Sequence, residues 1–168
     1  IAAGSVWNYL DNGSNQGTAW RAVGFDDSAW KSGPAQLGYG DGDEATIVSY
    51  GSNPNKKFVT TYFRKSFDVT GPSAVSALTL GLIRDDGAVV YLNGTEIYRN
   101  NMPSGTISYN TLASVAIGGA DESTWYSSAV SSSLLVSGIN VIAVEIHQSD
   151  LNSSDISFDF RLSATVAL

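Results

Sequence analysis

The sequence contains no cysteine and very little histidine or methionine. Among its 168 residues there is one histidine and one methionine. The absence of thiols excludes disulfides, thiolate nucleophiles and thiolate-ligated zinc, and a single imidazole argues against histidine-rich metal sites. The lack of cysteine does not by itself identify the compartment.

Positive charge and long hydrophobic runs are also scarce. Nine basic and 16 acidic side chains give a formal net charge of −7. This balance makes nucleic acid and anionic membranes poor partners, so we expect neither. No run reaches the roughly 18 apolar residues of a membrane-spanning helix, so we expect no membrane span.

The composition that remains is that of one globular domain. Hydrophobic residues make up 43% of the chain and charged residues 15%, which provides one sizeable core and excludes a charge-rich disordered chain. The length fits a single domain over residues 1–168. Because the chain begins at Ile1 without an initiator methionine or a charged leader segment, we interpret it as an excised module or a mature fragment.

The hydrophobic pattern has a period of two and predicts strands. In residues 60–69 the odd positions Phe63, Phe67 and Val69 form an apolar face. Residues 156–162 alternate in the same way, with apolar side chains at the even positions. Three further apolar runs predict short strands, and these are residues 78–84, 88–92 and 95–99.

Other segments indicate how these strands are joined. Residues 140–148 are rich in valine and isoleucine on both faces, which indicates a central strand. The dipeptides Asp86-Gly87 and Asn93-Gly94 are typical of hairpin turns.

The pattern favours an all-β fold, an antiparallel β-sandwich or jelly roll with long end loops. No long stretch has a helical apolar face, so we expect at most short helical turns, near residues 27–30 and 131–136. The stretches rich in glycine, serine and asparagine are expected to form the end loops, and these are residues 11–18, 38–56 and 149–155.

Several motifs occur together along nearly the whole chain. They are FDDSAW (25–30), LGYGDGDE (37–44), TYFRKSF (61–67), RDDGAVVYLNG (84–94), NVIAVEIHQ (140–148) and SSDISFD (153–159). With these motifs the chain resembles the galactose-binding-domain-like jelly rolls appended to large secreted bacterial proteins and carbohydrate-active enzymes. The strand followed by Asn-Gly is also similar to the sugar-binding jelly roll at the front of some glycoside hydrolases.

The resemblance implies a non-catalytic carbohydrate-binding module of galactose-binding-like fold. Such a module is secreted, binds a polysaccharide or oligosaccharide, and keeps a parent catalytic domain of the same polypeptide near that polymer. Many relatives also carry a structural calcium ion. The fold hosts purely structural domains as well, so a structural or adhesive spacer without its own ligand is the alternative. No phosphate loop or nucleophile elbow is found, and we expect no enzymatic activity.

Polar side chains opposite the apolar strand faces predict a sugar-binding row. Vicinal sugar hydroxyls both donate and accept, and planar groups such as guanidinium, carboxylate and amide match them. If the strands are neighbours, the row converges on one open recess; the alternative is a solvated face with weak ion pairs. The residues of this row are Arg64, Glu145, His147, Asp159 and Arg161, and Gln148 is a further candidate for sugar binding.

Two acidic segments are candidates for oxygen ligands. Arg84, Asp85 and Asp86 lie between apolar strands, where the carboxylates either bind calcium or sugar hydroxyls or simply shape a turn. Because Arg84 has the parity of the apolar positions in its strand, it requires a carboxylate partner.

The second acidic segment contains Asp41, Asp43 and Glu44. Its alternating oxygen ligands with glycine between them suit calcium, although the segment lacks the distal glutamate of an EF-hand loop. Asp121-Glu122 is a further acidic pair to consider.

Aromatic side chains complete the candidate site. We expect Trp7 and Trp30 to lie in the core. Trp125, Tyr126 and Tyr50 are candidates for exposed rings that stack on the apolar face of a sugar.

Overall fold

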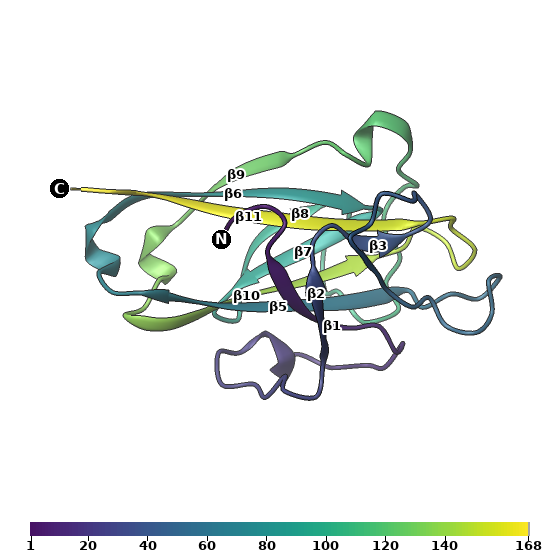
Figure 1. Ribbon diagram of the computed structural model, residues 1–168, viewed down its shortest axis with the longest axis horizontal. Coiled ribbons are helices and arrows are strands. Elements are labelled where there is room, and N and C mark those ends of the chain that lie inside the picture. The colour runs from purple at the N-terminus through teal and green to yellow at the C-terminus, as the bar shows by residue number, and fades with distance from the viewer. Residues whose placement is uncertain (168) are drawn as a thin grey trace.

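The computed structural model describes residues 1–167 as two β-sheets packed face to face (Figure 1). Sheet A has six strands in the order β2-β1-β5-β10-β7-β8, and sheet B has five in the order β4-β3-β11-β6-β9. The strands of sheet A are β1 (Val6–Leu10), β2 (Lys31–Pro34), β5 (Thr60–Val69), β7 (Gly87–Leu92), β8 (Thr95–Asn100) and β10 (Gly138–His147). The strands of sheet B are β3 (Leu37–Tyr39), β4 (Thr46–Ile47), β6 (Val75–Asp85), β9 (Tyr126–Val130) and β11 (Ile156–Val166).

The expected all-β sandwich is confirmed. Every strand pair is antiparallel except the short parallel pair of β3 and β4. The helical segments of residues 1–167 are short 3-10 turns, namely η1 (Ala19–Arg21), η2 (Pro72–Ala74), η3 (Gly119–Asp121) and η4 (Ser132–Leu134). The last of these matches a predicted turn. No helix in the described chain is long and apolar enough to cross a membrane.

The main core fills the space between the sheets. Alternate residues of β5 and β11 point inward, so Phe63 stacks on Phe158 with ring centroids 4.3 Å apart. Trp7 from β1 is fully buried and meets Phe158 and Phe160 edge to face. The prediction that Trp7 belongs to the core is therefore confirmed.

A second, smaller core lies on the outer face of sheet A. The segment 11–30, which contains η1, runs outside β1 and β5 (Figure 1). Trp20 in this segment is fully buried against Tyr62 and Tyr91, and Trp30 is half-buried beside them. The outer face of sheet A is therefore covered rather than solvated, and Trp30 packs against this second core.

The two predicted turn dipeptides behave differently. Asn93 and Gly94 both have positive φ angles and join the antiparallel strands β7 and β8, as a hairpin turn requires. Asp86-Gly87 instead carries the chain from β6 in sheet B to β7 in sheet A, so the predicted hairpin there is wrong. A Cβ at Gly87 would lie 2.7 Å from the backbone carbonyl oxygen of Asn101, so close packing favours glycine at this position.

Candidate functional site

The expected polar row is divided between the two sheets. Arg64 on β5 and Glu145 and His147 on β10 belong to sheet A, whereas Asp159 and Arg161 on β11 belong to sheet B. The prediction of a single open recess is therefore wrong. Strand parity gave the correct outward direction for each side chain, but direction alone does not determine which sheet a strand joins.

Arg64 is sealed beneath the segment 11–30. Its side chain is 3% exposed, and its Nε donates to Oδ2 of Asp27 at 2.8 Å. The rest of the guanidinium donates to the backbone carbonyls of Trp20, Ala22 and Phe25. In this structure Arg64 holds the covering segment in place and offers no surface to a ligand.

Glu145, His147 and Gln148 are also buried and engaged internally. Glu145 accepts from the hydroxyl of Tyr91 at 2.6 Å and from Arg21 at 3.3 Å. Nε2 of His147 lies 3.2 Å from Glu145, and Gln148 donates to the carbonyl of Phe58. Their polar groups contact other residues of the protein instead of the predicted sugar hydroxyls. A role of these three residues in sugar binding stays a prediction.

Arg84 has a carboxylate partner, as its position in the strand predicts, and this partner is Asp121. Nη2 of Arg84 lies 3.5 Å from Oδ2 of Asp121, and Nε donates to Asn100 at 2.6 Å. The guanidinium lies 4.4 Å from the centroid of the half-buried Tyr126 ring, whose hydroxyl donates to Asp121. Arg84 and Tyr126 therefore stabilise each other at the end of the sandwich, and the Tyr126 hydroxyl is engaged with Asp121.

Asp86 is buried and joins two loops. Its carboxylate accepts from the backbone N–H of Ile117 and of Ser149, both at 2.7 Å. Of the two alternatives for Asp86, a turn or a ligand site, these bonds to the backbone favour the turn.

The outer face of sheet B carries an arginine on a tryptophan ring. Arg161 is exposed, and its guanidinium carbon lies 4.5 Å from the centroid of the half-buried Trp125 ring. Arg161 reaches the ring by crossing Gly81, its partner on β6, where a Cβ would lie 2.6 Å from Nε. Asp159 on the same face is buried and accepts from the N–H of Gly4. Burial raises the pKa of Asp159.

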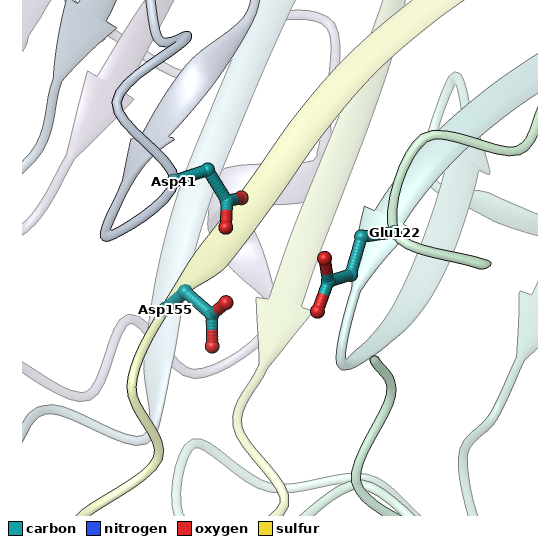
Figure 2. Close-up of side chains that lie close together, drawn as sticks. All are labelled: Asp41, Glu122 and Asp155. Atoms are coloured by element: carbon teal, nitrogen blue, oxygen red, sulfur yellow. The ribbon is translucent and has the colours of Figure 1, made fainter. Parts of the chain in front are cut away.

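Three carboxylates from three loops meet at the end of sheet B (Figure 2). Asp41 follows β3, Glu122 follows η3 and Asp155 precedes β11. Their ligand atoms all lie within 4.8 Å of one another. Figure 2 shows the three carboxylates pointing toward a common space.

Asp41 is positioned by the first residues of β11. The hydroxyl of Ser157 donates to Oδ2 of Asp41 at 2.9 Å, and Gln36 donates to the Ser157 hydroxyl at 2.8 Å. Burial, together with the nearby charges of Asp155 and Glu122, raises the pKa of Asp41 to about 6. Protonation of Asp41 therefore becomes easier, which lowers the negative charge of the cluster.

The predicted set of Asp41, Asp43 and Glu44 is also compact. One ligand atom from each lies within 4.8 Å of the others. Glu44, however, accepts from the N–H groups of Asp41 and Gly42 at 2.9 and 3.0 Å, so its carboxylate closes the loop on itself. Glu44 therefore shapes the loop that presents Asp41.

The cluster of Asp41, Glu122 and Asp155 is called the acidic end below. Near it lies Asp85, a buried carboxyl group without a hydrogen-bond partner in the described residues. It is 0% exposed, and neither of its carboxylate oxygens has a partner in residues 1–167. It pairs across the strands with Ser157, so both side chains point to the outer face of sheet B. Burial raises the pKa of Asp85 to about 9, and the charges of Asp86, Asp155 and Glu122 add to the rise.

Two cavities have several charged lining residues. The cavity at the acidic end has a volume of about 160 Å³ and is lined by Gln36, Asp41, Asp43, Gly119, Glu122 and Ser123. The other, of about 290 Å³, opens on the sheet A side and is lined by Thr18, Arg21, Tyr91, Glu96, Arg99, Gly105, Thr106 and Ile107. The second cavity contains none of the residues predicted from the sequence.

Sequence reasoning identified only part of the acidic end. Asp41 was predicted as a ligand and Glu122 was noted in an acidic pair, but Asp155 was not singled out. The available signal for Asp155 was its place directly before a strongly alternating strand, in a loop rich in serine. Its proximity to Asp41 depends on the pairing of β3 with β11, which the sequence does not reveal.

Comparisons with known proteins bear on the fold. No family model and no curated protein matches this chain. Among solved structures, a glycosyl hydrolase family 2 member from Bacteroides cellulosilyticus matches 97% of this chain with a TM-score of 0.61 and 14% identity. A beta-glucuronidase from an uncultured Clostridium species matches 98% with a TM-score of 0.55 and 14% identity.

A third match is a beta-glucuronidase from glycoside hydrolase family 2, with a TM-score of 0.53 and 17% identity over 86% of this chain. The matched regions amount to 13%, 20% and 28% of the three longer chains. At these identities the comparisons show a shared β-sandwich fold.

Proposed function

We propose that this chain is a non-catalytic carbohydrate-binding module within a larger secreted carbohydrate-active enzyme. The observation that carries the proposal is the pair of Trp125 and Arg161 on the outer face of sheet B. An aromatic ring stacks on the apolar face of a sugar, and a guanidinium donates in a fork to vicinal hydroxyls. Gly81 leaves the space that brings the two groups together.

The fold comparison supports this assignment. The matched solved structures are glycoside hydrolases of family 2, and this chain corresponds to a small part of each. Under this proposal the chain contributes binding, and the catalytic domain lies elsewhere in the polypeptide. The formal charge of −7 favours a neutral polysaccharide, because sulfated or uronate polymers would be repelled at long range.

The proposal is tested by binding of the 168-residue chain to a panel of immobilised polysaccharides and glycans. We expect retention on at least one neutral polysaccharide and a loss of affinity of about tenfold in Trp125→Ala, because the variant removes the ring on which the sugar stacks. Tyr109→Ala is the control, since Tyr109 is an exposed aromatic residue on a different loop. An equal loss in both variants, or none in Trp125→Ala, would contradict the assigned site.

A structural spacer is the second candidate function. It is favoured by the outer face of sheet A, where Arg64, Glu145 and His147 bond to the protein itself. In that case the outer surface serves contacts with neighbouring domains. Failure to bind any member of the panel would remove the carbohydrate-binding proposal and leave the spacer.

A further inference from the structure

The acidic end gathers negative charge with little local compensation. Like charges within a few ångströms of one another are costly where water is partly excluded. No lysine or arginine of residues 1–167 forms an ion pair with Asp41, Asp85, Glu122 or Asp155. The nearby Lys57 donates instead to the backbone carbonyls of Ser153 and Ser154.

Asp85 is an independent sign that the site is incomplete. A buried carboxyl group normally has hydrogen-bond partners, because leaving it unpaired costs free energy. Within residues 1–167 the 0% exposed Asp85 has none, although it lies on the same side of sheet B as Ser157, whose hydroxyl donates to Asp41. A positive charge at the acidic end would offset the charge of the three carboxylates and would favour ionisation of the buried Asp85 carboxyl group.

We propose that Asp41, Glu122 and Asp155 bind one calcium ion at this end of the sandwich, beside the buried carboxyl group of Asp85. The ligand set consists of carboxylate oxygens, which hard cations prefer, and it contains no thiolate or imidazole. The only histidine, His147, is buried and bonded to Thr60 and Thr111. Calcium accommodates ligands from separate loops more readily than magnesium, which demands near-ideal octahedral geometry.

Binding would join three segments that are remote in the sequence. The loop after β3, the turn at η3 and the loop before β11 would share one ion. Such a link stabilises the folded state, because the unfolded chain does not hold these carboxylates together. The inference does not depend on the proposed carbohydrate function, since the site and its test involve no sugar.

The test is calcium titration of the 168-residue chain after treatment with EDTA, followed by calorimetry and thermal unfolding. We expect one bound ion per chain and a rise in the melting temperature of about 5–10 °C at a hundredfold excess over Kd. Magnesium at the same concentration should give a smaller rise. No heat of binding and no shift in melting would overturn the proposal, and an equal response to magnesium would overturn the assignment to calcium.

Variants locate the ion. Asp155→Asn and Glu122→Gln should each weaken calcium binding at least tenfold. Asp68→Asn removes an exposed carboxylate from β5 and should bind calcium as the unmodified chain does. Each variant is compared in EDTA by circular dichroism, so that loss of folding is separated from loss of binding. Unchanged affinity in both Asp155→Asn and Glu122→Gln would place the ion elsewhere and contradict the site.

Discussion

At the scale of single residues, burial separates side chains that look alike in the sequence. Arg64 and Arg161 both lie opposite the apolar parity of a strand. Arg64 is 3% exposed and bonded to Asp27, whereas Arg161 is exposed and lies on Trp125. The first is therefore a structural residue in this fold, and the second is available to a ligand.

Replacement of Arg64 by methionine should destabilise the protein. Arg64→Met leaves Asp27 and several buried carbonyls without their donor, and we expect a loss of about 2–4 kcal/mol in the free energy of unfolding. The loss falls below that of a fully buried pair because Asp27 is partly exposed. Urea unfolding measures it, with Lys56→Met on an exposed loop as the control. A change no larger than that of the control would show that Arg64 does not hold the covering segment.

The two arginines show that the strand pattern does not predict whether an outward-facing side chain is buried. Alternation in 60–69 and 156–162 correctly predicted which side chains leave the main core. It carried no information about the second core, because Trp20 and Tyr91 come from segments far apart in the chain. A residue that faces away from one core can therefore still be buried in another.

At the scale of elements, strands with regular alternation were predictable and their connections only partly so. The central position of β10 between β5 and β7 follows from its apolar residues on both faces. The pairing of β3 with β11, which brings Asp41 to Ser157, leaves no local signal. The short β4 also escapes periodicity, because two residues cannot display a pattern.

The close approach of β3 to β11 depends on Gly38. A Cβ there would lie 2.0 Å from the carbonyl oxygen of Ile156, so a larger residue must push the strands apart. Gly38→Ala should therefore lower the free energy of unfolding by about 1–3 kcal/mol, as measured by chemical denaturation. Gly71→Ala is the control, because nothing lies within 4 Å of a Cβ at Gly71. Equal stability of the two variants would refute the close-packing argument.

At the scale of the whole molecule, the two outer faces of the sandwich differ. The outer face of sheet A is covered by the segment 11–30 and its second core (Figure 1). The outer face of sheet B presents Trp125 and Arg161, with the acidic end at the termini of β3, β6 and β11. The sandwich itself was predictable from the sequence, but the segment 11–30 that covers the outer face of sheet A was not. The predicted site therefore included residues from both sheets.

The central claim is that ligand binding belongs to the outer face of sheet B. The most direct measurement maps amide chemical shifts of the 168-residue chain, in the presence of calcium, during titration with an oligosaccharide of the polysaccharide that retains it. The account predicts that the largest shifts surround Trp125 and Arg161. The largest shifts around Arg21, Glu96 and Arg99, at the cavity on the sheet A side, would contradict it.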